Sequence, residues 1–334
     1  MTRKTKLYLT LILSTVLSII LFLTVWIFTY KDLIKGNLSN PNVQIAMLKI
    51  LSRRSIQMLA IIMSVVLITI SSLSFQTISN NRILTPSILG FDAIFIITQT
   101  LLVGLFGGLS IYIVNEYINF TITTILMIGI VGLMFLSVIR KNKNNIVLLL
   151  LLGLVITSLA NSITNFIQVF MNPDEFQQVV SLTTVNINAI NSNLVLISIP
   201  IFIIMLILFS LEHKYYDVIA LGEDHAINLG VNYNKKSNLS ILYITISMAV
   251  ATALVGPLSF LGLIVVNSAK ELFKTNKHKT LMITSSLIAI TIILGGQVIL
   301  ELLSIKTPVT VVVNLIGGLY LIYILVKENI KWLK

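Results

Sequence analysis

The residues best placed for chemistry in this sequence are the acids at the edges of its long apolar stretches. Asp92 begins one such stretch and Glu301 ends another. Acidic side chains within a membrane often carry protons or ions in gradient-driven carriers. A carboxylate at a helix start is also favoured by the helix dipole and by capping. We therefore expect Asp92 to serve its helix start, and Glu301 to pair with nearby Lys306 at the outer interface.

Enzyme chemistry is not supported by the sequence. The chain has no cysteine, and its three histidines, His213, His225 and His278, fall in polar connections where we expect solvated side chains. It contains neither the G-x-x-x-x-G-K-[ST] loop that binds ATP phosphates nor the H-E-x-x-H zinc motif. We expect no catalytic residue, metal site or cofactor, and any ATP hydrolysis should belong to a separate subunit.

Composition indicates the elements that must position these residues. Of 334 residues, 56% are hydrophobic and 10% are charged, whereas soluble domains are about 25% charged. So few charges cannot cover a water-exposed surface, which predicts a membrane protein. The net charge of +11 fits basic loops beside anionic lipid, so no nucleic-acid partner is expected.

The number of spans depends on one interrupted stretch. A span needs about 20 apolar residues, but the run 238–266 has 29 and contains Gly256-Pro257. Proline kinks or ends a helix, so the run is either one kinked helix or a span followed by a half-span. Splitting it places 17 of the 23 lysines and arginines on one side and six on the other, as the positive-inside rule requires. Left unbroken, it gives no such bias.

We therefore predict an all-α polytopic membrane protein with ten transmembrane helices and both termini in the cytoplasm. The expected spans are 7–30, 56–75, 92–114, 118–139, 146–170, 193–211, 238–255, 256–266, 281–303 and 308–326. The segment 211–237 would be a cytoplasmic connection. Because non-helical backbone at membrane depth must be buried or line a cavity, Gly256 and Pro257 are candidate parts of a transport pathway.

A polar stripe marks the fifth predicted span. It consists of Ser158, Asn161, Asn165 and Gln168, whose spacings of three and four place them on one helix face. Such a stripe requires water or a partner helix to satisfy it. It would either line a pathway or join helices.

Three segments carry a family pattern. The first is QTISNNRILTPSILG, with Gln76, Asn81, Pro86 and Gly90; the second is LGEDHAINLGV, from Leu221 to Val231; the third is GPLSFLGL, from Gly256. They resemble the Q-x4-N-P-L-x2-P-x2-L-G, L-G-E-x2-A-x2-L-G and G-P-I-x-F-x-G-L motifs of the FecCD-type family of ABC importer permeases. That family takes up iron siderophores, haem and cobalamin. The resemblance covers roughly residues 45–326.

The resemblance implies an assembly in the cell membrane. Two permeases would surround one pathway, with two ATPase subunits below and an extracytoplasmic substrate-binding lipoprotein above. Arg82, Asn267 and Lys270 depart from the usual pattern, and these variants resemble the ferric-catecholate branch of low-GC Gram-positive bacteria, which often pairs non-identical permeases. Iron-siderophore import is the expected function. Haem or cobalamin import is the alternative within the family, and an ion-gradient carrier is the alternative of another class.

The second motif implies ATPase coupling by one short segment. Its residues are Leu221, Gly222, Glu223, Ala226, Leu229 and Gly230. We expect a compact helical knob between the two glycines, with Glu223 near its start. A plain surface turn is the alternative.

An outer basic cluster implies a second docking site. We expect Lys31, Lys35, Lys49, Arg53 and Arg54 to share one outer loop. In the family an R-x-P-R motif there pairs with acids of the binding protein; Arg54 falls on its first arginine, Gln57 replaces the second, and Arg53 would compensate. Arginine suits such contacts because its planar fork holds a carboxylate. The alternative is simple anchoring at lipid headgroups.

Overall fold

The computed structural model describes residues 3–29, 41–141, 146–185, 190–305 and 307–332, and every regular element in these ranges is helical. The elements are α1 (Arg3–Thr24), α2 (Trp26–Thr29), α4 (Pro41–Ile78), the 3-10 helix η1 (Pro86–Leu89), α5 (Phe91–Phe106), α6 (Ile111–Val114), α7 (Glu116–Lys141), α8 (Ile146–Val169), α9 (Pro173–Thr183), α10 (Ser192–Ile219), α11 (Glu223–Asn228), α12 (Tyr233–Val255), α13 (Leu261–Phe273), α14 (His278–Leu302) and α15 (Val309–Trp332).

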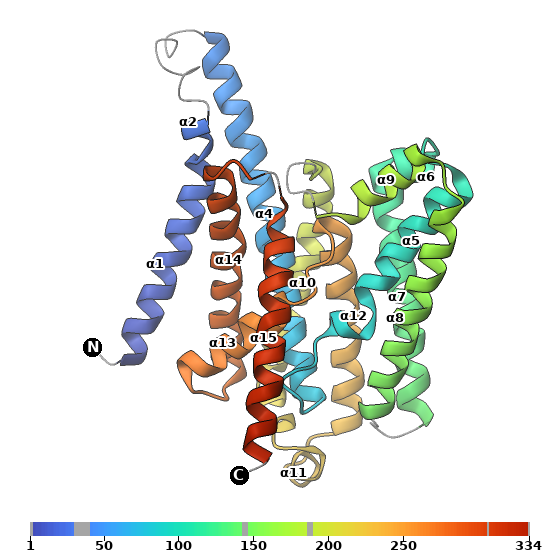
Figure 1. Cartoon of the computed structure of the whole chain (residues 1–334). Coiled ribbons are helices and arrows are strands. Elements are labelled where there is room, and N and C mark those ends of the chain that lie inside the picture. The colour runs from blue at the N-terminus through green and yellow to red at the C-terminus, as the bar shows by residue number, and fades with distance from the viewer. Residues whose placement is uncertain (1–2, 30–40, 142–145, 186–189, 306, 333–334) are drawn as a thin grey trace.

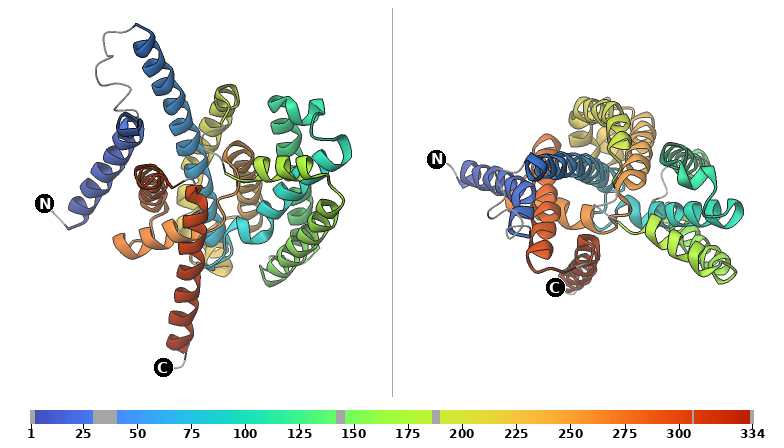
Figure 2. Two further views of the ribbon diagram at one scale, coloured as in Figure 1. Left: turned by 45° about the horizontal axis from the view of Figure 1, so that its top comes forward. Right: turned by 90° about the horizontal axis from the view of Figure 1, so that it is seen from above.

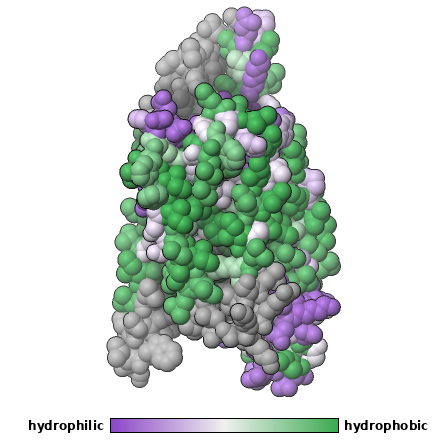
Figure 3. Space-filling model, turned by 90° about the vertical axis from the view of Figure 1, so that its right-hand side faces the viewer, coloured by the Kyte–Doolittle hydropathy of each residue, from purple (hydrophilic) through white to green (hydrophobic). Residues whose placement is uncertain are grey.

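The polytopic membrane class is confirmed. Within the described ranges, seven helices are long and apolar enough to cross a membrane, and two shorter apolar helices are α5 and the part Val309–Tyr323 of α15. One face of the molecule shows a broad hydrophobic belt, with hydrophilic residues gathered toward its two ends (Figure 3). A bilayer selects this distribution because its core excludes charge while its surfaces accept it.

The helices are arranged around α4, which packs against α12, α14, α10 and α13. From Ala60 to Ile78 its side chains are almost all buried. In contrast, α1, α8 and α10 expose most of their apolar residues, as expected for lipid-facing positions or for positions that meet another subunit. Helices α5 to α9 stand on one side of the bundle and α1 on the other (Figure 2).

The bundle has two ends that carry different features. We call the end with α11 the inner end and the end with the start of α4 the outer end. Both termini lie in the lower half of the view, toward the inner end (Figure 1).

The start of α4 differs from the outer loop that was expected from the sequence. The helix begins at Pro41, whereas the expected span was 56–75. Charged residues do not interrupt a helix whose hydrogen bonds are made by the backbone, and proline suits a first helical position. Lys49, Arg53 and Arg54 therefore lie on a helix, while Lys31 and Lys35 lie outside the described residues.

The third expected span, 92–114, is shortened at its outer end. Helix α5 ends at Phe106, and Gly107 follows with φ of 78°. That left-handed conformation costs glycine little and ends the helix. The apolar residues beyond it form a turn and the single-turn α6. Apolar composition alone therefore overestimated the length of the helix.

The interrupted seventh run consists of two helices rather than one kinked helix. Helix α12 stops at Val255, residues 256–260 are non-helical, and α13 begins at Leu261. Gly256 has φ of 97°, and an added Cβ there would lie 2.8 Å from Val185 Cγ2. The half-span lies further along the chain than the expected 256–266. The expected connection 211–237 is also mostly helical, because α10 continues to Ile219 and α11 follows it.

Candidate functional site

The short helix α11 is held between two glycines at the inner end. Gly222 precedes it with φ of 99° and Gly230 follows it with φ of 80°. The Val231 N–H donates to the Ala226 carbonyl at 3.0 Å, and the Gly230 N–H donates to the Ile227 carbonyl at 2.9 Å. This pair of bonds is a Schellman motif, which requires a left-handed residue at its glycine. The motif therefore specifies a defined knob rather than a loose turn.

The knob exposes apolar side chains. Leu221, Ile227 and Leu229 are 57%, 53% and 61% exposed, and Glu223 stands in the first turn. Ala226 is completely buried, so its side chain packs against its own chain, and its expected part in ATPase coupling stays a prediction. Ile227 was missed because it occupies a variable position of the motif. Exposed leucine-type side chains at one end of the bundle offer a surface for another protein.

The end of α4 is fastened to α13. The Lys270 Nζ donates to Gln76 Oε1 at 2.9 Å, and Asn81 Oδ1 accepts from the Ile83 N–H at 2.9 Å to form a turn. Lys270 lies in the last turn of α13, beyond the expected half-span.

The departures from the family pattern lie together. The Asn267 amide donates to the Arg82 carbonyl at 3.0 Å, which joins α13 to the segment after α4. Lys270 lies on the same helix, one turn beyond Asn267. Residues that depart from the family pattern in two distant segments are thus brought together at the inner end.

Two interrupted segments meet beside α5. In the first, Pro86 begins η1 and Gly90 ends it with φ of 98°. An added Cβ on Gly90 would lie 2.9 Å from Thr157 Oγ1, so η1 packs closely against α8. In the second, which holds Gly256 and Pro257, Ser259 donates to Asp92 Oδ2 at 2.5 Å. Asp92 does lie in the first turn of α5, but its carboxylate also ties this helix to the other segment.

The polar stripe of α8 is divided between two environments. Ser158, Asn161 and Asn165 are exposed on the chain surface. Gln168 is partly buried and donates to Thr100 Oγ1 of α5 at 3.5 Å. The stripe thus joins helices only at Gln168, and its other members remain available to water or to a second subunit.

At the outer end, Arg54 makes contacts within the chain. Its guanidinium pairs with Glu301 of α14 and donates to the Phe22 carbonyl at 2.9 Å. It also lies 5.3 Å from the centre of the Phe22 ring. Glu301 was expected to pair with Lys306, which lies outside the described residues. The partner of Glu301 in the structure is Arg54 of α4. Arg54 thus fastens α4 to α1 and α14.

Arg53 and Gln57 lie differently from Arg54. Gln57 is 4% exposed, and its expected part in docking stays a prediction. Arg53 is exposed and, with Lys49 and Glu116, lines an outer cavity of about 860 Å³ between α4, α7 and the start of α10. Of the three expected docking residues, Arg53 alone faces outward.

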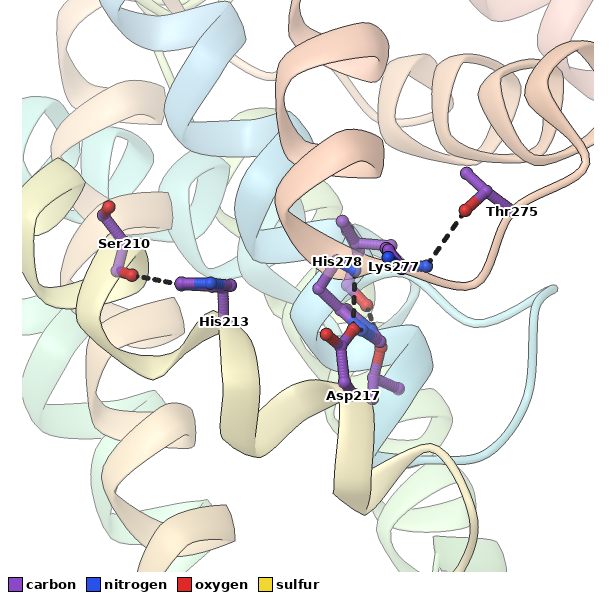
Figure 4. Close-up of polar contacts among 8 residues, drawn as sticks. Ser210, His213, Asp217, Thr275, Lys277 and His278 are labelled. Atoms are coloured by element: carbon purple, nitrogen blue, oxygen red, sulfur yellow. Dashed lines mark hydrogen bonds and ion pairs between the residues drawn. The ribbon is translucent and has the colours of Figure 1, made fainter.

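Two of the three histidines differ from the expected solvated loop residues, whereas His225 is exposed on the short helix α11. His213 lies on α10, where its Nδ1 is 2.5 Å from the carbonyl of Ser210 on the same helix. His278 is the first residue of α14 and is 3% exposed. Its ring lies against Asp217, whereas His213 points away from this contact (Figure 4). A polar residue at a helix start had looked like a loop residue in the sequence.

Comparison with known proteins places these features in a family. Residues 10–327 match the model of the FecCD transport family. The petrobactin import system permease protein YclO of Bacillus subtilis is 40% identical over 283 residues, covering 84% of this chain and 90% of that protein. The petrobactin import system permease protein FatC of Bacillus anthracis is 27% identical over 281 residues, covering 84% of this chain and 79% of that protein.

A solved structure has the same fold. It is described as an inward-facing conformation of a metal-chelate type ABC transporter, with a TM-score of 0.79 and 20% identity, covering 96% of this chain and 99% of that one. The resemblance predicted from three motifs is therefore confirmed at the level of the whole chain. This chain belongs to the FecCD transport family.

Proposed function

We propose that this chain is the membrane-spanning permease subunit of an ABC importer that carries an iron–siderophore complex into the cytoplasm. The observation that carries this proposal is the glycine-bounded knob α11, which exposes Leu221, Ile227 and Leu229 at the inner end. An importer that lacks its own nucleotide site requires such a surface to receive ATPase motion. The named petrobactin permeases among its relatives favour a siderophore as the ligand.

The proposed assembly has two permeases, two ATPase subunits and an extracytoplasmic binding lipoprotein. The exposed part of the α8 stripe, Asn161 and Asn165, would face the pathway or the second, non-identical permease. Arg53 and Lys49 would meet acids of the binding protein at the outer cavity. The interrupted segments at Pro86, Gly90, Gly256 and Pro257 would flank the moving parts, because non-helical backbone in a membrane is otherwise costly.

The proposed topology has ten spans, with α13 as the half-span and both ends of this chain in the cytoplasm of a Gram-positive cell. Since the chain contains no cysteine, single cysteines report accessibility without background. Asn276→Cys, between α13 and α14, should be labelled only after permeabilisation. Labelling of intact cells at this position would contradict the topology.

The function is tested by uptake in a strain that lacks this chain. Uptake of ⁵⁵Fe-petrobactin should be lost and should return with the wild-type chain, while haem and cobalamin uptake should be unchanged. Loss of haem or cobalamin uptake instead would support the alternative within the family. If uptake stops when the ion gradient is collapsed at constant ATP, the chain is an ion-driven carrier and the ABC assignment fails.

A further inference from the structure

A buried histidine joins three helices directly above the knob. The Asp217 Oδ1 of α10 accepts from both the backbone N–H and the Nδ1 of His278, each at 2.7 Å. On the other side of the ring, Nε2 lies 2.7 Å from Thr77 Oγ1 in the last turn of α4. One side chain therefore bridges α10, α14 and α4 (Figure 4).

Asp217 supplies a cap that α14 lacks. The N-cap residue Lys277 makes no side-chain cap bond, and the first N–H groups of a helix have no partner within it. The Asp217 carboxylate accepts one of them from a different helix. A carboxylate only accepts hydrogen bonds, so Nδ1 carries the proton in this contact. The contact thus combines a cap with a charge-assisted bond.

Thr77 fixes the other side of the ring. Its hydroxyl lies 2.8 Å from the Leu73 carbonyl of its own helix as well as 2.7 Å from His278 Nε2. With the proton on Nδ1, a neutral ring has an accepting Nε2, and the Thr77 hydroxyl donates to it. Only a doubly protonated ring would donate from Nε2, and the hydroxyl would then donate to the Leu73 carbonyl. In both cases the ring spans the gap between Asp217 and α4. Burial makes either bond costly to leave unmade.

The same carboxylate stands next to the knob in the chain. Asp217 lies two residues before the end of α10, and residues 220–222 join α10 to α11. This turn is tight: the N–H groups of Ala220, Leu221 and Gly222 donate to carbonyls of α10 at 2.9–3.0 Å. Because this turn has little conformational freedom, a displacement of α11 would also move Asp217.

Resting on the proposed function, we propose that His278 is a positioning residue that transmits displacement of α11 to α4 and α14. The path runs from α11 through the tight turn to Asp217, then through the imidazole to Thr77. Without this bridge, α10 could shift with the ATPase while α4 and α14 stayed in place. Nucleotide hydrolysis would then continue without transport.

The test compares transport with hydrolysis in the complete importer reconstituted in liposomes. Thr77→Val removes the hydroxyl and keeps the branched shape, and Asp217→Ala removes the carboxylate. Each should lower ⁵⁵Fe-petrobactin transported per ATP hydrolysed by about fivefold, which corresponds to the loss of roughly one buried hydrogen bond. ATPase copurification and hydrolysis rate should stay within about twofold of wild type, because neither residue lies on the exposed surface of α11.

Two matched controls separate this role from general damage. Thr77→Ser keeps a hydroxyl at the same place and should restore the wild-type ratio. His213→Ala removes a histidine from the same region of α10 whose hydrogen bond goes to Ser210 of its own helix, and it should leave the ratio unchanged.

An unchanged ratio in Thr77→Val would overturn the proposal, because that substitution leaves the helix intact and removes only the bridge. A parallel fall of transport and hydrolysis with loss of the bound ATPase would also overturn it, because the role would then be assembly. If the wild-type importer shows no ATP-dependent uptake of any ferric siderophore, haem or cobalamin, the proposed function has failed instead.

Discussion

The two ends of α4 are fastened in different ways. At the outer end a single arginine, Arg54, pairs with Glu301 and the Phe22 carbonyl. At the inner end the last turn of α4 meets His278 of α14, Lys270 of α13 and, through Ile78, the hydroxyl of Tyr233 of α12. Arg54 thus ties the outer end to α14 and α1, whereas consecutive residues of the last turn tie the inner end to α14, α13 and α12.

Motion and recognition can be separated in one chain by this arrangement. Contacts from three consecutive residues, Gln76, Thr77 and Ile78, leave the inner end little freedom. Under the proposed coupling, a displacement at α11 would reach the bundle as a whole. The outer end keeps a wide cavity beside Arg53 and Lys49, where a partner can bind without rearranging the core. Substitutions at the two ends should therefore differ in their effects on transport, stability and association.

The largest effect is expected from placing a charge on the knob. Leu229→Asp should reduce uptake by at least about tenfold, because a charge in the centre of a protein interface costs more than about 1.4 kcal/mol. ATPase copurification should fall with it. Leu109→Asp is the matched control, since Leu109 is an equally apolar residue that is 93% exposed on the outer side. Equal losses in both variants would remove the distinction between the ends.

A smaller effect, on stability rather than transport, is expected at the outer pair. Arg54→Leu leaves the partly buried Glu301 without its partner and should lower the free energy of unfolding by about 2 kcal/mol. Adding Glu301→Gln should recover part of the loss, as a double-mutant cycle in detergent would measure. Arg53→Leu, one residue away and exposed, is the control and should change stability by no more than about 0.5 kcal/mol. Additive losses would mean that the two residues are not coupled.

The exposed neighbour Arg53 should affect association instead. Arg53→Glu combined with Lys49→Glu should slow docking of the binding protein to the permease in nanodiscs by about tenfold at low salt, and less at high salt. Acid-to-base changes on the binding protein should restore part of the rate. Docking that is unchanged at low salt would leave these residues as lipid anchors only.

Sequence patterns predicted the local elements of this molecule well where backbone rules decide them. The glycines around Glu223 and the Gly256-Pro257 break are local signals, because positive φ and a missing N–H act on their own segment. The outer limit of α5 was missed because the apolar stretch continues past Gly107. The start of α4 was missed because charged residues are compatible with a helix outside the bilayer.

The contacts between distant segments could not be predicted in the same way. Arg54 finds Glu301 across 247 positions, and His278 finds Asp217 across 61. No pattern within a short window encodes such pairs, and polar residues at helix ends look like loop residues in sequence. Knowledge of the fold is required to bring them together.

The smallest expected effect concerns the contact of Lys270 at the inner end. Lys270→Met keeps a long side chain but removes the donor to Gln76 Oε1, which lies 2.9 Å from Nζ. Loss of this hydrogen bond should lower the free energy of unfolding in detergent by about 1.5 kcal/mol. Lys274→Met, at an exposed position directly after α13, is the control and should leave the free energy of unfolding unchanged. Equal stability of wild type and Lys270→Met would mean that this bond adds nothing, and the inner end would then be held by His278 and Tyr233 without it.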